Sequence, residues 1–265
     1  MRGTALHRRL VSEVAAARLP REPLDLELVT EADLSGLPAP AQRYLRFMGV
    51  LGRRRDSSFS AHFHGRFRRS PGARWMPCEA WQYNSGVEVA RIFLLRVRFG
   101  GVLSMAARGI YLRGHGRMTG KLLGLVRVVD AKGPEFDVGE LVPYVNDAVL
   151  MAPSLLLGPR TSWSAVDDES FNLTFTDADH RITARVFVDE RGAVHDFTST
   201  DKMAALPAGL VRALWHTPVS GWRAVDGRQL PTRGSSTFDV EDGPYTYAEF
   251  EFDSDSVVYN VVPEA

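Results

Sequence analysis

Two acidic residues near the middle of the chain have the type and spacing that acid–base chemistry requires. Glu140 and Asp147 are seven residues apart, which is about two turns of a helix and places both on nearly the same side. A carboxyl group held in an apolar pocket has a raised pKa and can donate or accept a proton near neutral pH. We therefore predict Glu140 and Asp147 as catalytic candidates. The alternatives are that Glu140 caps the helix and that Asp147 is solvated.

The segment 137–157, which carries both residues, is predicted to be an amphipathic helix. Asp137 followed by Glu140 is typical of a capping box, and Pro153 is expected to end the helix. Pro143 lies inside the pattern and should bend or split it. Such a helix between strand-like segments is expected to lie across a sheet as a plug or lid. Its apolar face consists of Leu141, Tyr144, Val145, Ala148 and Val149.

A histidine pair is the next candidate. His62 and His64 lie on one side of a predicted strand, as a metal site would require, and a third ligand such as His115 or Glu79 would have to come from another strand. The rest of that face is polar, which favours a solvent-facing surface or the wall of a polar cavity. We predict no metal ion there and keep both histidines as ligand-binding candidates.

Aromatic side chains could form the walls of an apolar pocket, although most of them are expected to build ordinary core. Tyr144 could either line such a pocket or pack in the core. Together with the two histidines, the predicted ligand-binding residues are Trp81, Tyr83, Tyr144, Met151, Trp215 and Trp222.

Composition excludes several classes of function. The 32 basic residues balance the 32 acidic residues, which argues against a nucleic-acid-binding or anionic-membrane surface. Cys78 is the only cysteine, so the chain has no internal disulfide, and a reducing compartment fits best. The chain has no dinucleotide-binding loop, phosphate-binding loop or hydrolase motif, and we predict no cofactor.

The N-terminal residues lack the apolar core of a signal peptide. No run approaches the ~20 apolar residues of a membrane span. We therefore predict a cytoplasmic protein without an integral membrane segment. The sequence gives no indication of its oligomeric state.

Periodicity predicts an α+β fold. Helical spacing indicates one helix over the first eighteen residues or so and another over 37–48, whereas alternation of period two begins near Ser57. Asp226-Gly227 predicts a two-residue hairpin turn. The apolar segment 203–215 is predicted as a further short helix. We expect a large curled antiparallel sheet of about ten strands, forming a half-barrel or barrel, with residues 1–36 as an N-terminal helix and linker and 37–265 as one domain.

Three segments carry a resemblance. They are LPAPAQRYLR (37–46), GKLLGLVRVVDAKGPE with GELVPY (120–144) and WRAVDGRQLPT (222–232). They resemble a bacterial family of unknown function, and the last is also similar to strands of LolA-like lipoprotein carriers. The resemblance to LolA-like carriers implies a half-barrel that holds acyl chains under a helical lid. Such a resemblance would cover residues 37–258.

These observations lead to one leading expectation and two alternatives. The protein is expected to bind a bulky apolar small molecule, lipid-like or polyketide-like, and to act on it without a cofactor as a cyclase or isomerase of specialised metabolism. The first alternative is a non-catalytic carrier of hydrophobic ligands. The second is a protein-binding scaffold that uses the segment 203–215 as its contact.

Overall fold

Four α-helices and one large sheet account for most of the residues that the structure describes. The computed structural model describes residues 4–20, 27–99, 103–122, 126–206 and 209–260. Its helices are α1 (Ala5–Ala17), α2 (Glu31–Ser35), α3 (Ala39–Phe47) and α4 (Pro134–Met151), with 3-10 turns at Pro153–Leu156 and Ser254–Ser256. None of these helices, in the part of the chain described, combines the length and apolar character that crossing a bilayer requires.

The large sheet is antiparallel throughout and contains fifteen strands among the described residues. They are β1 (Ser58–Phe67), β2 (Met76–Ser85), β3 (Ala90–Arg98), β4 (Ser104–Leu112), β5 (His115–Leu122), β6 (Val126–Lys132), β7 (Thr161–Asp167), β8 (Ser170–Asp177), β9 (His180–Val188), β10 (Val194–Ser199), β13 (Leu214–His216), β14 (Val219–Ser220), β17 (Arg233–Val240), β18 (Gly243–Phe252) and β19 (Val258–Tyr259).

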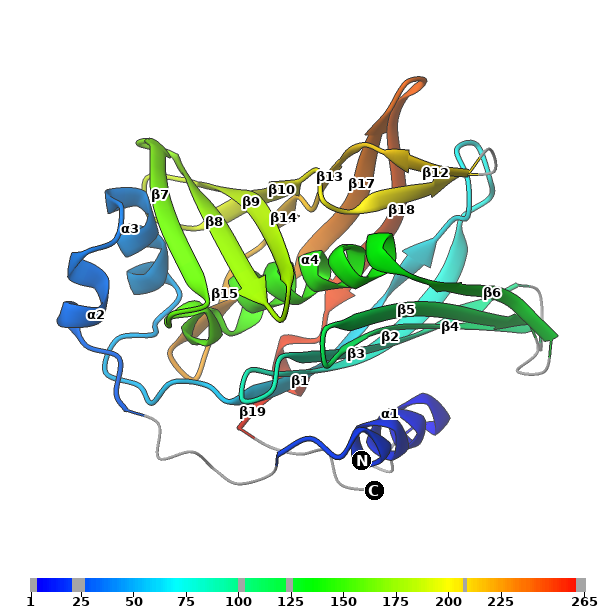
Figure 1. Cartoon of the computed structure of the whole chain (residues 1–265), viewed down its shortest axis with the longest axis horizontal. Helices are drawn as coiled ribbons and strands as arrows, with labels where there is room; N and C mark the ends of the chain where they lie inside the picture. The colour runs from blue at the N-terminus through cyan, green and yellow to red at the C-terminus, as the bar shows by residue number, and fades with distance from the viewer. Residues whose placement is uncertain (1–3, 21–26, 100–102, 123–125, 207–208, 261–265) are drawn as a thin grey trace.

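The strand order runs β6-β5-β4-β3-β2-β1-β18-β17-β13-β10-β9-β8-β7. In the described residues the edge strands β6 and β7 do not pair with each other, so the sheet is curled but open, and the closed-barrel option of the sequence prediction is wrong. The prediction of about ten strands was too low, because two-residue strands such as β14 and β19 are too short to show alternation. Figure 1 shows the sheet curving around α4.

The two faces of the sheet have different partners because side chains alternate along each strand. In β3, Leu95 and Val97 join the large core that also contains α4, whereas Ile92 and Leu94 join a second apolar cluster on the outer face. That second cluster is covered by α1, which lies outside the curve of the sheet (Figure 1). The α1 side of this contact consists of Leu6, Leu10, Val14 and Ala17, the apolar residues at helical spacing that the sequence contains.

Helix α4 is enclosed almost completely, since every residue from Gly139 to Met151 is buried. The predicted capping box is wrong because the helix begins earlier, at Pro134, with proline in a first-turn position that its fixed φ angle favours. Asp137 therefore lies inside the first turn, and its Oδ1 accepts a hydrogen bond from the backbone N–H of Gly116 at 2.6 Å. Pro143 does not split the helix, which continues to Met151.

The predicted helix over 203–215 is also wrong. β11 (Met203–Leu206) and β12 (Gly209–Arg212) form a small hairpin instead, and β13 then returns to the large sheet. Gly209 has a φ of +127°, a conformation that residues with a side chain rarely adopt, and Pro207 would interrupt a helix. The apolar spacing outweighed these two signals in the prediction.

A second small hairpin pairs β15 (Arg223–Val225) with β16 (Arg228–Leu230). Its turn residues Asp226 and Gly227 have φ values of 48° and 74°, which are the two positive φ angles of the predicted turn type. This prediction is confirmed.

Gly116 is expected to be essential for the packing of β5 under the start of α4. A Cβ atom at this position would lie 1.9 Å from the carbonyl oxygen of Phe136, so Gly116→Ala must push the helix away and should cost about 1–3 kcal/mol of unfolding free energy. Gly139→Ala is the matched control, because a Cβ there meets no atom within 4 Å and should stabilise the helix by about 0.5–1 kcal/mol. Urea denaturation of both variants measures the difference, and equal stabilities would contradict the close packing.

Candidate functional site

A cavity of about 440 Å³ lies between α4 and the inner face of the sheet. From α4 it is lined by Glu140, Pro143, Asn146, Asp147 and Leu150, which recur at helical spacing on one face. The opposite face of the helix, with Leu141 and Val145, packs in the core. The sheet supplies mostly apolar walls, namely Phe63, Phe67, Phe93, Leu95, Met105, Ala107, Met118, Val129, Trp215, Val219, Tyr247, Ala248, Phe250 and Phe252.

Four buried charged side chains line this cavity, whose walls are otherwise mostly apolar. Arg91 of β3 donates from Nε to Asp147 Oδ2 at 2.6 Å, and its Nη1 lies 3.5 Å from Glu140 Oε2. Lys202 approaches from the other side, with Nζ 3.9 Å from Glu140 Oε1. Gly109 leaves room for the group, because a Cβ there would lie 2.7 Å from Glu140 Oε2. We call Arg91, Glu140, Asp147 and Lys202 the ion cluster.

The position of Lys202 has a local cause in the sequence of α4. Pro143 has no N–H and cannot donate to the carbonyl four residues earlier, which leaves the Gly139 oxygen without its helical partner. Lys202 Nζ donates to that oxygen at 3.1 Å. The proline inside the helix thus explains why a buried lysine is held beside it.

Burial acts on both signs of charge in the ion cluster. It raises the pKa of Asp147, an effect that Arg91 opposes, and it lowers the pKa of Lys202, an effect that Glu140 opposes. At the same end of the cavity, Trp215 Nε1 donates to the Tyr247 hydroxyl at 3.0 Å. Burial raises the pKa of Tyr247 to about 12, so this phenol stays protonated at neutral pH.

The structure brings three of the predicted site residues together and separates the others. Glu140, Asp147 and Trp215 line the cavity. Tyr144 and Met151 are buried in the core instead, and the Tyr144 hydroxyl has no hydrogen-bond partner among the described residues. Trp222 donates to the carbonyl of Val194, away from the cavity lining. Whether Glu140 and Asp147 are catalytic stays a prediction.

Sequence reasoning missed two members of the ion cluster, Arg91 and Lys202. Arg91 alternates with Ile92 on a strand that reads as an ordinary amphipathic segment, so nothing local marks it. Lys202 had one usable signal, which is Pro143: a proline inside a buried helix requires a donor from elsewhere for Gly139.

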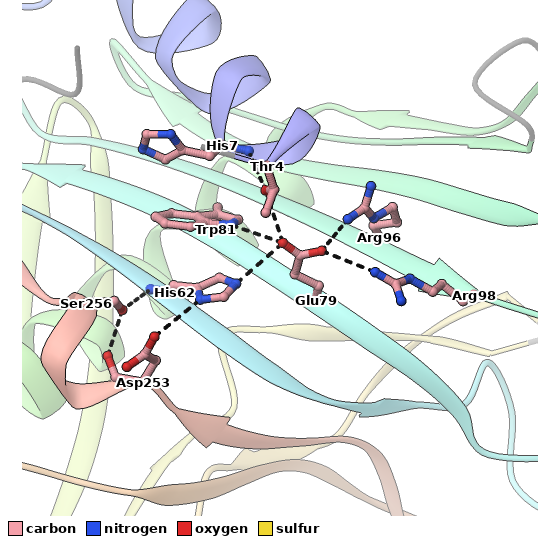
Figure 2. Close-up of polar contacts among 9 residues, drawn as sticks. All are labelled: Thr4, His7, His62, Glu79, Trp81, Arg96, Arg98, Asp253 and Ser256. Carbon is pink, nitrogen blue, oxygen red and sulfur yellow. Dashed lines mark hydrogen bonds and ion pairs between the residues drawn. The ribbon is translucent and has the colours of Figure 1, made fainter. Parts of the chain in front are cut away.

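The remaining predicted residues lie on the outer face of the sheet, where Figure 2 shows a second polar group. Its centre is the buried carboxylate of Glu79, which accepts from Trp81 Nε1 at 3.3 Å and from Thr4 Oγ1 at 3.2 Å. His62 Nε2 lies 3.4 Å from the same carboxylate. Arg96 donates to Glu79, and Arg98 lies 3.7 Å away.

This outer group connects the start of α1 to the sheet. Thr4 is the N-cap of α1 and accepts from the backbone N–H of His7 at 3.2 Å while it donates to Glu79. Burial pushes the pKa of Glu79 upward, but Arg96, together with the hydrogen bonds from Trp81 and Thr4, outweighs it and leaves the pKa below its ordinary value. Tyr83 packs under α1 in the outer apolar cluster. The outer group therefore anchors a helix, and none of its members lines the cavity.

The two histidines differ in burial. His62 is buried and stacks on Trp81, with ring centroids 4.3 Å apart, whereas His64 is exposed. His62 Nδ1 also lies 3.6 Å from Asp253. Within the described ranges, no three histidine, cysteine or carboxylate side chains are grouped so that they could hold a metal ion.

We expect His62 to make the protein less stable in mild acid. Burial, followed by the neighbouring His64, lowers the pKa of His62 below 6.5 despite the opposing effect of Glu79 and Asp253. As the pH falls below 6.5, the unfolded chain binds a proton that the folded chain still excludes, so the free energy of unfolding decreases. Urea denaturation between pH 7.5 and pH 5.5 should show a weaker pH dependence for His62→Asn than for the wild type.

The control for this prediction is His64→Asn, which removes the second cause and should move the pKa of His62 back towards 6.5. Imidazole resonances followed by NMR report that pKa directly. A wild-type His62 that titrates above 6.5 would contradict the prediction.

Comparison with known proteins identifies the family of the chain and two distantly similar structures. Two solved structures are distantly similar to it, both with a TM-score of 0.40. A LolA superfamily protein from Nitrosomonas europaea is 10% identical over 86% of this chain and 93% of its own. A putative outer membrane lipoprotein-sorting protein domain from Vibrio parahaemolyticus is 8% identical over 77% of this chain and 85% of its own. No curated protein matches the sequence. Residues 27–250 match the model of a family of unknown function, DUF6544, and the chain belongs to that family.

Proposed function

We propose that the protein binds an apolar small molecule in the cavity beside α4. The observation that carries the proposal is the cavity itself, about 440 Å³ of space with mostly apolar walls. Protein interiors rarely contain voids much larger than a water molecule, whereas ligand pockets typically have volumes of roughly 300–1,000 Å³. The space therefore has the size of a binding site rather than of a packing defect.

Access is available at one end of the cavity. Its lining there includes the half-buried Met105 and Met118 and the exposed Val129 and Arg69. Flexible methionine side chains adapt to ligands of different shape. A ligand that leaves water for the apolar walls gains roughly 25 cal/mol per Å² of apolar surface buried, which is enough for affinity without many polar contacts.

The proposal is for binding alone. The cyclase or isomerase expected from Glu140 and Asp147 needs a carboxyl group that is available to the ligand as an acid or base. Arg91 holds Asp147 at 2.6 Å, and Glu140 lies between Arg91 and Lys202. Both carboxylates thus have cationic partners already.

Titration with N-phenyl-1-naphthylamine, a neutral apolar dye that becomes fluorescent out of water, tests the proposal. We expect saturable binding of one dye per chain, with energy transfer from Trp215 that decreases in the Trp215→Phe variant. Fluorescence that rises linearly with dye, without saturation, would refute the proposal.

A further inference from the structure

The buried charges at the cavity sum to zero, and this limits what the ligand can carry. Arg91 and Lys202 supply two positive charges, and Glu140 and Asp147 supply two negative charges. All four residues are at most 9% exposed. Moving a further charge into this space would leave it without a partner, which is costly in a low-dielectric interior.

The sum is zero when all four groups are ionised, and it stays zero when one group of each sign becomes neutral. Burial raises the pKa of Asp147 and lowers that of Lys202. If both became neutral, Arg91 and Glu140 would still form one balanced pair. The sum of the ion cluster is therefore zero in both of these states.

Charges at the edge of the cavity do not change this sum. Arg108 pairs with Glu13 of α1 at 2.7 Å on the outer face of the sheet. Arg69 is exposed to solvent, where its charge is screened. Neither supplies an unpaired buried cation for an anionic ligand.

The cavity nevertheless offers hydrogen-bond donors that the protein does not use. An ammonium group can donate three hydrogen bonds, and among the described residues Lys202 Nζ makes one, to Gly139. Asn146 accepts from Thr217 Oγ1 at 2.6 Å through its side-chain oxygen, and within the same residues its NH₂ group has no partner. Both side chains line the cavity. An acceptor oxygen on the ligand would take hydrogen bonds from these two donor groups.

We propose that the ligand is an uncharged amphiphile, an apolar chain or ring system that ends in a neutral oxygen such as a hydroxyl or ester carbonyl. The oxygen accepts hydrogen bonds from Lys202 and Asn146, and the apolar part lies along the sheet. Free fatty acids and alkylamines are excluded by their charge. This inference rests on the proposed function and specifies its ligand class.

Displacement of the neutral dye at pH 7.5 by four ligands of equal chain length tests the inference: decan-1-ol, methyl decanoate, decanoate and decylammonium. We expect the alcohol and the ester to displace the dye at concentrations at least tenfold below those of either ion. Binding of the alcohol without the ester would identify a hydroxyl group as the required head group, and the reverse result would identify an ester.

Charged molecules also leave water less readily than neutral ones, so the ranking needs a test within the protein. Glu140→Gln makes the ion cluster net positive and should improve decanoate relative to decan-1-ol by about tenfold or more. Asp147→Asn makes the same change of charge and serves if Glu140→Gln does not fold. Glu249→Gln is the matched control, because this half-buried residue pairs with Arg66 outside the cavity and its loss should leave the ranking unchanged.

The outcomes separate the two proposals. If the dye binds saturably but decanoate displaces it as well as decan-1-ol does, or if the cluster variants rank the ligands as the wild type does, the uncharged-amphiphile inference fails while the cavity remains a binding site. The inference also fails if none of the four ligands displaces a bound dye. If the dye itself does not bind, the proposed function fails.

Discussion

Arg91→Met is expected to lower the free energy of unfolding by about 3–5 kcal/mol, the usual cost of removing one partner from a buried ion pair. Arg91 is the shared partner of Asp147 and Glu140, at 2.6 Å and 3.5 Å. Without it, Asp147 must either remain an unpaired buried anion or take up a proton, and both alternatives cost free energy. Urea denaturation at pH 7 measures the loss.

The double variant Arg91→Met/Asp147→Leu provides the matched comparison. It leaves Glu140 with Lys202 and replaces the other pair by apolar side chains, which is often nearly neutral for stability. The double variant should therefore be more stable than Arg91→Met alone, although it contains one substitution more. A double variant that is less stable than the single one would show that Asp147 is stabilised by groups other than Arg91.

Ala107→Trp is expected to abolish most dye binding while leaving the fold intact. Ala107 lies on β4 with its side chain on the cavity wall, so an indole there occupies space that the ligand needs. Excluding roughly 110 Å² of apolar ligand surface at about 25 cal/mol per Å² weakens binding by about 100-fold. The dissociation constant of the dye measures this loss, and circular dichroism checks the fold.

The neighbouring Ala106 gives the control for this prediction. It pairs with Arg96 on the outer face of the sheet and does not line the cavity. Ala106→Trp should keep the wild-type affinity for the dye. Equal affinities for the two tryptophan variants would mean that the dye binds somewhere other than the cavity.

The sequence carried the regular parts of this fold because periodicity is a local property. The helix over the first eighteen residues or so appears in the structure as α1, and the strand predicted to begin near Ser57 appears as β1. The helix over 203–215 failed because its apolar spacing fits either structure, and only Gly209 and Pro207 distinguish them. The start of α4 was predicted at Asp137 because an aspartate followed by a glutamate three residues later is typical of a capping box. The helix begins at Pro134 instead, and the aspartate lies inside its first turn.

The candidate site could be predicted only in part. Glu140 and Asp147 lie on the same helix, so their spacing was enough to predict that they face the same space. Arg91 comes from β3 and Lys202 from the segment between β10 and β11. The curl of the sheet brings these two residues close to α4, although the strands involved are far apart in sequence. No local sequence pattern predicts such a contact.

Helix α1 matters for the choice of chain boundaries in an expression experiment. The family match begins at residue 27, and α1 ends at Ala17, so a shortened chain that starts at the matched segment would lack the helix that shields Tyr83, Ile92 and Leu94. Those side chains would then form an exposed hydrophobic patch on the outer face of the sheet. Patches of this kind promote aggregation during purification. Retaining the first twenty-six residues is therefore the simplest way to obtain well-behaved material for the binding experiments.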